Sequence, residues 1–247
     1  MEDRLLMLFK FGEKGNLKKL QSGQLYCRNA QYYVDYEKTG NQSVGDKYEC
    51  QEVMYNSRIT LIDRKNGQII VDGISSEITM QDNQLMKAPM YCCTYISTND
   101  LYKVKEDETS ITFGCDCVKL FKDFFDKDYW EYCLFAPADK VLQKFKKTCR
   151  NKSIEFSYNK VNYYDPEITP MEKEYSIAED FNNIAFWKTK NYEDQREFRF
   201  LLKNKSILSN RDNFTLNIGN LSEFSTLIET NKLKELELRI VYKKIYK

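Results

Sequence analysis

Histidine is absent from the 247 residues of this chain, and its absence excludes much enzyme chemistry. Neither a Ser-His-Asp nor a Cys-His nucleophile pair can form. A zinc or non-haem iron site that uses imidazole is excluded as well. Any proton transfer must therefore use Glu, Asp, Tyr, Lys or Cys.

The chain also lacks a large excess of charge of one sign. It has 38 Lys and Arg against 37 Asp and Glu, a formal net charge of +1. This balance argues against a DNA-mimicking inhibitor, which would be strongly acidic, and against a protein that mainly binds nucleic acid, which usually carries a basic excess.

Long apolar runs are lacking too, and Met1-Glu2-Asp3-Arg4 does not open a signal peptide. We therefore expect a cytoplasmic protein with no membrane partner. Its eight cysteines are then reduced thiols. The close pairs, Cys92-Cys93 and Cys115-x-Cys117, do not have the spacing of a zinc knuckle, so we expect buried small side chains and no metal site.

The order of strand and helix patterns predicts the fold class. Strand and helix signals alternate irregularly, and no repeat or Pro/Gly/Ser-rich linker divides the chain. This favours a single α+β domain over residues 1–247, with a central, mostly antiparallel sheet flanked by helices. Three segments are expected in that sheet: Pro89–Ile96, Gln195–Leu202 and Leu233–Tyr242.

Residues 51–88 are expected to form an inserted β-hairpin region that turns at Asn66-Gly67, because Asn-Gly between apolar runs is a strong hairpin signal. Ser153–Tyr164 alternates as a strand does. Helices are expected at Asn16–Gln21, Cys117–Phe125, Tyr175–Trp187 and Leu221–Glu229, and after Pro137, where Val141, Leu142 and Phe145 mark the buried face. Gly23 lies just past the first of these helices, where glycine often ends a helix.

The most informative motif opens the predicted strand Gln195–Leu202. Gln195, Glu197 and Arg199 alternate with Phe198 and Phe200, so a strand places the three polar side chains on one face and the phenylalanines in a core. Polar groups aligned in this way either form a site or lie on the wet face of an edge strand, and the spacing alone leaves both interpretations open.

Two segments resemble known families. The N-terminal order, Leu8-Phe9-Lys10-Phe11-Gly12 followed by Asn16-Leu17-Lys18-Lys19-Leu20 and then Gly23-Gln24-Leu25-Tyr26, resembles that of DarT-type ADP-ribosyltransferases. It also resembles an uncharacterised bacterial family that opens with L-Y-K-Y and carries W-x-x-E-x-E-W-R near its end. Residues 192–199, Tyr-Glu-Asp-Gln-Arg-Glu-Phe-Arg, are similar to that second motif.

The order of motifs resembles the three regions of mono-ADP-ribosyltransferases. Ser97-Thr98 would fill the second region and Gln195-x-Glu197 the third. The first region has Lys10 in place of the family's Arg or His, and lysine lacks the planar fork of arginine.

The resemblance implies an ADP-ribosyltransferase-like fold and an enzyme that uses NAD to modify a macromolecular target, either protein or nucleic acid. Glu197 would stabilise the positive charge that develops as nicotinamide leaves, and Gln195 would bind the acceptor. Lys10 would contact the pyrophosphate, Tyr26 would stack on nicotinamide, and Ser97 or Thr98 would orient Glu197.

A second hypothesis is a catalytically inactive binding or inhibitor protein on the same scaffold. Such a protein would be a bacterial or phage defence or anti-defence factor that acts by contact with a protein or nucleic acid. A cleft that joins Lys10, Ser97 and Glu197 would favour the enzyme, whereas their separation would favour the binding protein.

Overall fold

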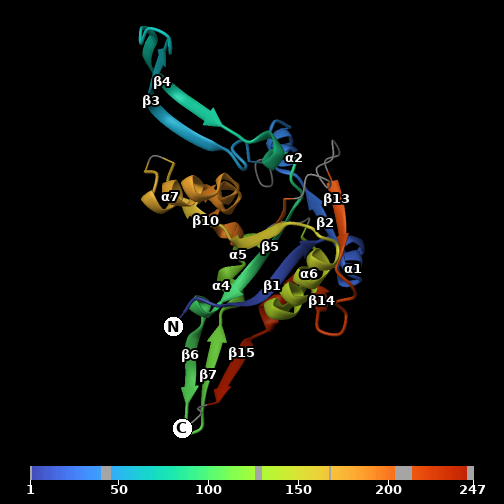
Figure 1. Ribbon diagram of the computed structural model, residues 1–247. Helices are drawn as coiled ribbons and strands as arrows, with labels where there is room; N and C mark the ends of the chain where they lie inside the picture. The colour runs from blue at the N-terminus through green and yellow to red at the C-terminus, as the bar shows by residue number, and fades with distance from the viewer. Residues whose placement is uncertain (1, 40–45, 126–129, 167, 204–212, 244–247) are drawn as a thin grey trace.

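The computed structural model, which describes residues 2–39, 46–125, 130–166, 168–203 and 213–243, shows an α+β fold built on an eight-stranded sheet (Figure 1). The strand order is β13-β2-β5-β1-β8-β14, and β12 pairs with both β5 and β9. All pairings in this sheet are antiparallel. The fold class predicted from the sequence, a mostly antiparallel sheet flanked by helices, is therefore confirmed.

The strands of this sheet are short. Their bounds are β1 (Leu5–Gly12), β2 (Gln24–Arg28), β5 (Met90–Ser97), β8 (Tyr132–Pro137), β9 (Phe156–Lys160), β12 (Glu197–Leu202), β13 (Asn213–Asn217) and β14 (Thr226–Glu229). Every residue of β12 is buried, because β12 lies between β5 and β9 and is covered on both faces.

Two helices cover the first face of the sheet. They are α1 (Lys14–Gln21) and α6 (Ala138–Asn151) (Figure 1). Their apolar side chains pack against Leu8, Phe198 and Phe200. Gly23 follows α1 with a φ of 100°, a conformation that glycine tolerates best, so the predicted end of this helix is confirmed.

The second face is covered by two separate groups of helices. Phe9 packs at one end with the short helices α4 (Cys117–Leu120) and α5 (Lys122–Phe125). At the other end, Met90 packs in a cluster drawn from three short elements: α2 (Ala30–Glu37), α3 (Asn83–Met86) and the 3-10 helix η2 (Phe181–Phe186). The two groups belong to separate apolar clusters, so this face has one core at each end.

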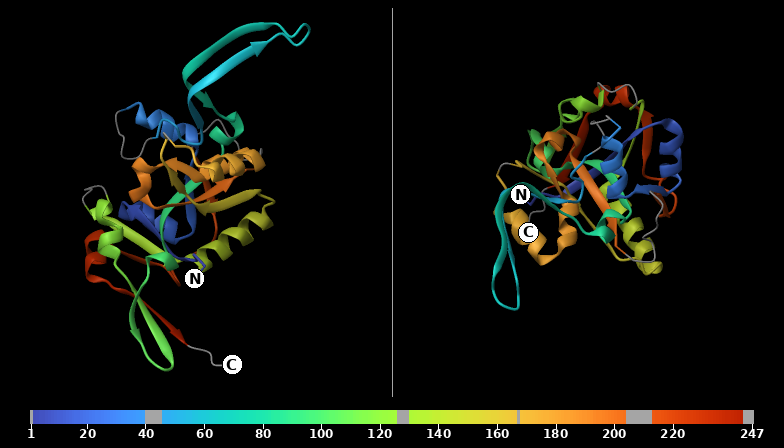
Figure 2. Two further views of the ribbon diagram at one scale, coloured as in Figure 1. Left: turned by 90° about the vertical axis from the view of Figure 1, so that its left-hand side faces the viewer. Right: turned by 90° about the horizontal axis from the view of Figure 1, so that it is seen from above.

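Two smaller sheets stand away from the body. β3 (Glu52–Ile62) and β4 (Ile69–Met80) form a hairpin, called the arm below, whose connection contains Asn66 and Gly67 as predicted. β15 (Leu238–Lys243), β7 (Ser110–Cys115) and β6 (Tyr102–Glu106) form the other sheet. The arm and this sheet lie at opposite ends of the molecule (Figures 1 and 2).

Two C-terminal predictions were wrong. Leu221–Glu229 is a turn followed by β14, because the β-branched Thr226 and Ile228 pair with β8. Leu233–Tyr242 does not join the central sheet. Its first residues lie in the 3-10 helix η4 (Thr230–Glu235), and β15 pairs with β7.

Three other predicted elements are interrupted. Tyr175–Trp187 is divided at Asp180 into α7 (Met171–Glu179) and η2, and the strand β11 (Trp187–Thr189) begins where η2 ends. Ser153–Tyr164 contains β9 and then β10 (Asn162–Tyr164), which pairs in parallel with β11. Cys117–Phe125 is split at Phe121.

Within the described ranges, no helix combines the length and apolar character needed to cross a membrane.

Candidate functional site

A crevice opens where β1 separates from β5. The two strands pair from Leu5 opposite Ser97 to Phe9 opposite Thr94, and their pairing stops there. Beyond Phe9, β1 continues along β8 while β5 continues along β12. The cavity between them has a volume of about 260 Å³ and lies on the second face, between the two separate cores.

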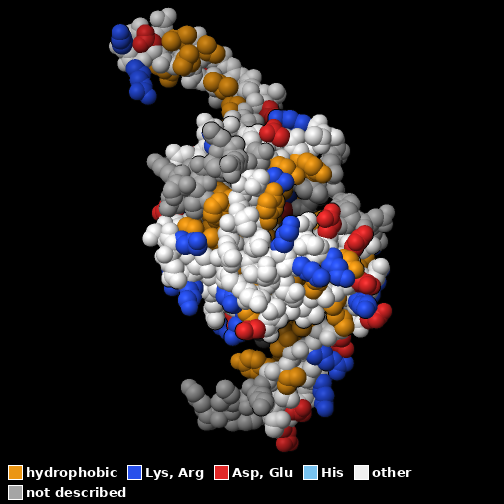
Figure 3. Space-filling model, turned by 90° about the vertical axis from the view of Figure 1, so that its right-hand side faces the viewer, with side chains coloured by type: hydrophobic (Ala, Val, Ile, Leu, Met, Phe, Trp, Pro, Cys, Tyr) orange, Lys and Arg blue, Asp and Glu red, His pale blue; other side chains and the backbone are white. Residues whose placement is uncertain are grey.

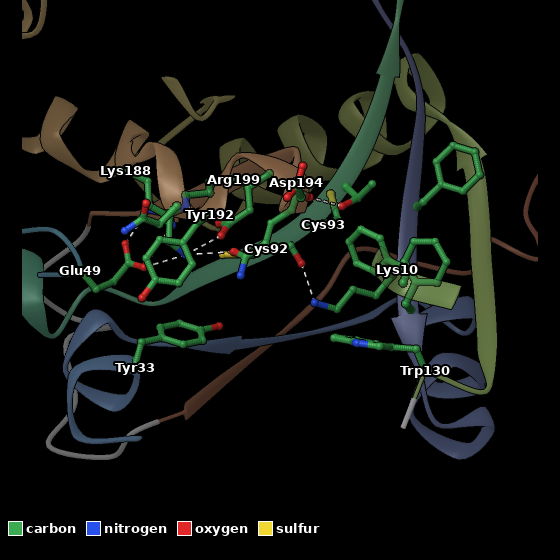
Figure 4. Close-up of a pocket in the computed structure, with 17 residues that line it drawn as sticks. Lys10, Tyr33, Glu49, Cys92, Cys93, Trp130, Lys188, Tyr192, Asp194 and Arg199 are labelled. Atoms are coloured by element: carbon green, nitrogen blue, oxygen red, sulfur yellow. Dashed lines mark hydrogen bonds and ion pairs between the residues drawn. The ribbon is translucent and has the colours of Figure 1, made fainter. Parts of the chain in front are cut away.

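The two ends of the crevice differ in chemistry (Figure 4). One end is aromatic and is lined by Phe9, Phe11, Phe124 and Trp130. Phe11 and Phe124 are stacked there, with 4.3 Å between ring centroids. The other end carries charged and phenolic groups: Tyr33, Glu49, Lys188, Tyr192, Glu197 and Arg199.

β12 supplies the floor of the charged end. Glu197 and Arg199 point into the crevice, whereas Phe198 and Phe200 pack into the core under α6. The predicted alternation of these four side chains is therefore confirmed. Gln195 is not part of the strand. It ends the 3-10 helix η3 (Lys190–Gln195), and Arg196, in the left-handed region at a φ of 46°, separates it from β12.

The charged floor is a closed ionic network. Arg199 donates from Nε to Glu197 at 2.7 Å and from Nη1 to Glu49 at 2.6 Å. A third donation, again from Nη1, reaches the carbonyl oxygen of Ala185 at 2.7 Å. Lys188 donates to the other oxygen of Glu197 at 2.8 Å and lies 3.7 Å from Glu49. Two cations and two carboxylates thus neutralise one another.

This network fixes the protonation of its members. Burial alone would raise the pKa of Glu197, but Arg199 and Lys188 lower it well below its usual range. Burial opposes the charged form of Lys188, and Glu197 and Glu49 nevertheless raise its pKa. Glu197 is therefore an ionised carboxylate with both oxygens already accepting hydrogen bonds.

Asp46 lies beside this network and behaves differently. It is 4% exposed, and one of its oxygens accepts a hydrogen bond from the backbone N–H of Tyr48. Burial and the nearby carboxylate of Glu49 raise the pKa of Asp46 to about 6. The charge of Asp46, which lies beside the network, therefore changes as the pH passes through about 6.

Lys10 bridges the opening between the two strands. Its Nζ donates to the carbonyl oxygen of Cys92 at 2.7 Å, across the gap where a β1–β5 backbone hydrogen bond would otherwise form (Figure 4). It lies 5.3 Å from the ring centroid of Tyr91, which favours a cation. Among the described residues Lys10 has no ion pair, so its charge is not neutralised by a carboxylate.

The structure brings three of the six predicted site residues together. Lys10, Gln195 and Glu197 all line the crevice. The side-chain oxygen of Gln195 accepts a hydrogen bond from Lys188 at 3.0 Å. Gln195 thus occupies the expected place although its expected strand geometry was wrong.

The other three predicted residues do not line the crevice. Tyr26 is 49% exposed on β2, with its ring beside Arg28. Ser97 does not contact Glu197, because its N–H and hydroxyl donate to Asp100, the last residue of the 3-10 helix η1 (Thr98–Asp100). Thr98 accepts from the backbone N–H of Arg4 and donates to the Glu2 carbonyl.

Thr94 occupies the position at which Ser97 was expected. It is paired directly opposite Glu197 and lines the crevice, and its hydroxyl donates to the Gln195 carbonyl at 2.5 Å. A Ser or Thr does therefore hold the Gln195–Glu197 segment, three residues earlier in β5 than predicted.

Sequence reasoning missed Glu49 and Lys188, the two groups that complete the network. Glu49 lies 150 residues from its partner Arg199 along the chain. A signal was present, because an arginine within a run of apolar strand residues must find a carboxylate when it is buried. The sequence therefore predicts that Arg199 has a carboxylate partner, but it does not identify Glu49 as that partner.

Metal and thiol chemistry find no support in this crevice. The described residues contain no group of three or more Cys, Asp or Glu that could hold a metal ion. Burial raises the pKa of Cys92 to about 12, so this thiol is protonated at neutral pH and is a poor nucleophile.

Comparisons of the chain with protein-family models, curated proteins and solved structures gave no match.

Proposed function

We propose that this protein binds NAD in the crevice between β1 and β5 and transfers its ADP-ribosyl group to a macromolecular acceptor. One observation carries the proposal: a single cavity contains an uncompensated lysine, a set of aromatic rings and the Gln195–Glu197 pair. The lysine, the rings and the Gln195–Glu197 pair match the phosphate, the planar base and the ribose hydroxyls of a nucleotide, respectively.

The crevice fits part of a dinucleotide. Its volume of about 260 Å³ lies just below the range of roughly 300–1,000 Å³ typical of small-molecule sites. One nucleoside with its phosphate therefore fits inside, and the second would extend through the open side. Lys10 would hold a phosphate, and the stacked rings of Phe11 and Phe124 would form an apolar wall for a base.

NAD supplies the glycosidic bond that is cleaved when nicotinamide leaves. The chain supplies the negative charge of Glu197, which the network keeps ionised. Lys188 and Arg199 hold that carboxylate in one orientation, and Lys188 also holds the amide of Gln195. Gln195 and Asp194 line the crevice, and both would contact an acceptor group.

A second candidate function is binding of the same ligand without transfer. It is favoured by the pairing of Glu197, because both carboxylate oxygens already accept from cations. A carboxylate held in this way must give up one of these hydrogen bonds before it can bind a ribose hydroxyl. If neither bond is released, the crevice is a receptor site and the protein acts through its bound state.

The deciding experiment follows both halves of NAD. Purified protein is incubated with NAD labelled in its adenylate half, together with DNA, RNA or bacterial protein extract in separate reactions. We expect nicotinamide release and label on one class of macromolecule. Binding of NAD with no release would favour the second candidate, and neither binding nor release at millimolar NAD would refute both.

A pair of lysine variants makes this experiment specific to the crevice. Lys10→Met removes the ammonium at the opening, and we expect it to lower nicotinamide release at least tenfold. Lys14→Met removes an exposed lysine of α1 whose Nζ lies over the Tyr132 ring, and we expect no change. Equal loss in both variants would show that the crevice is not the site of the reaction.

A further inference from the structure

The arm exposes an unusual amount of apolar side chain. Ile59, Leu61, Ile69 and Val71 are 44%, 52%, 57% and 51% exposed, and Ile70 and Ile74 are 60% and 77% exposed. Hydrophobic side chains gather along the arm where it stands away from the body (Figure 3). Large exposed apolar patches usually mark interaction surfaces.

The apolar side chains include an uncharged row on one face of the arm. Leu61 is paired opposite Val71, and Ile59 is two residues before Leu61, so these three share a face. A β-bulge interrupts the pairing beyond Leu61, and Ile69 is then opposite Ile62, outside this row. The opposite face carries the Arg58–Asp72 ion pair, with 2.7 Å between Nη2 and Oδ2, and the Thr60 hydroxyl donates to the same Asp72.

The arm is also poorly supported by the rest of the chain. β3 and β4 pair only with each other, so each strand has an unpaired edge among the described residues. A two-stranded hairpin alone is marginally stable in water, and an open apolar strand pair readily contacts another chain. A surface that covers the apolar row would stabilise the arm in its extended form.

We propose that the row formed by Ile59, Leu61 and Val71 packs against the same row of a second copy of this chain. The charge distribution supports a second copy. The row itself has no charged residue, so two rows can meet face to face without opposing charges. Both Arg58 and Asp72 lie on the outer faces of the resulting pair, where water solvates them.

The charge of the arm disfavours a polyanionic partner. Residues 52–80 contain three cations, Arg58, Arg64 and Lys65, against four carboxylates, Glu52, Asp63, Asp72 and Glu77. The arm therefore has a net charge of −1, which does not attract nucleic acid or an acidic membrane surface.

The face of the arm is small for a protein interface, so the contact between two arms is expected to be weak. A two-stranded ribbon of 11 residues is roughly 37 Å long and 10 Å wide, a face of about 370 Å². Stable complexes bury about 800 Å² on each partner. The dimer is therefore weak and reversible, and we expect it to dissociate within the concentration range of the experiment below. The inference is independent of any ligand in the crevice.

Sedimentation analysis of the full chain across 5 µM to 1 mM tests this proposal. We expect a monomer–dimer equilibrium in the wild type. Leu61→Lys places a charge in the row and should weaken the dimer at least tenfold. Thr60→Lys places the same charge on the opposite face, beside Asp72, and should leave the equilibrium within about twofold of wild type.

Circular dichroism of both variants confirms that each retains the fold, since Leu61 and Thr60 lie on the arm and outside the cores. A wild type that remains monomeric at 1 mM overturns the proposal and leaves a different protein as the partner of the arm. A dimer that persists in Leu61→Lys, or that is lost equally in Thr60→Lys, overturns it as well.

Discussion

The floor of the crevice and the arm invert the usual distribution of side chains in opposite ways. The crevice floor buries charge, with Arg199 fully buried and Glu197 only 8% exposed. The arm exposes aliphatic side chains such as Ile74, which is 77% exposed. Neither arrangement is the most stable choice for the isolated chain, since buried charges lose solvation and exposed apolar groups gain nothing from folding.

The two regions depart from the usual distribution of side chains for different physical reasons. The buried charges satisfy one another inside the chain, and among the described cations of the crevice Lys10 has no ion pair and keeps its charge for a ligand. The exposed apolar row of the arm is not satisfied inside the chain. The first region is therefore suited to bind a small polar molecule, and the second to bind another surface.

Arg199→Met should have the largest effect on stability. It removes the cation that pairs with both Glu49 and Glu197 and leaves the two carboxylates with Lys188 alone. Breaking a buried network in this way costs about 3–5 kcal/mol, a fall in midpoint of roughly 10 °C. Thermal unfolding measures the effect, and Arg239→Met, which removes an exposed arginine, is the control and should leave the midpoint unchanged. Equal midpoints in the two variants would contradict a buried network.

Glu197→Gln should cost less than Arg199→Met, about 2 kcal/mol, because the amide oxygen still accepts one hydrogen bond. The same variant should lose nicotinamide release when it is measured at a temperature where it remains folded. Loss of stability together with full activity would show that Glu197 is a structural group only.

Asp46→Asn should stabilise the protein at neutral pH. The folded state raises the pKa of Asp46 from 3.8 to about 6, so the folded protein holds this proton more tightly than the unfolded chain does. The stabilisation that comes from the protonated form of Asp46 is present below pH 4 and is lost as the pH rises through 6. Urea unfolding should therefore give a gain of roughly 2–3 kcal/mol at pH 7.5 and no difference at pH 4. A gain that is equal at both pH values would contradict a raised pKa.

Arg58→Ala should have the smallest effect. Its ion pair with Asp72 lies on the exposed face of the arm, where water screens the charges. We expect an unchanged thermal midpoint and an unchanged sedimentation profile. A clear shift in the midpoint or in the sedimentation profile would show that the Arg58–Asp72 pair contributes to stability or to association, contrary to this prediction.

Local patterns predicted the parts of the fold that depend on neighbouring residues. The Asn66-Gly67 hairpin, the glycine after α1 and the alternation from Glu197 to Phe200 all follow from backbone preferences or from period two. These features also placed Glu197 correctly on the face that became the crevice.

Contacts between distant segments were not predictable in the same way. The alternation of β15 suits any half-buried sheet, so it could not show that β7 was its partner. The apolar spacing from Tyr175 to Trp187 resembled one helix, but Asp180 has an extended backbone and caps a new 3-10 turn. Lys188 and Glu49 reach the crevice from a short strand and a loop, for which the sequence carries no periodic signal.

The central claim is that Lys10 and the crevice bind a nucleotide, and calorimetric titration of NAD tests it most directly. We predict saturable binding to the wild type, at least tenfold weaker binding to Lys10→Met, and wild-type affinity in Lys14→Met, with all three proteins sharing one thermal midpoint within about 2 °C. The absence of heat at millimolar NAD, or equal affinity in Lys10→Met and the wild type, would contradict the claim.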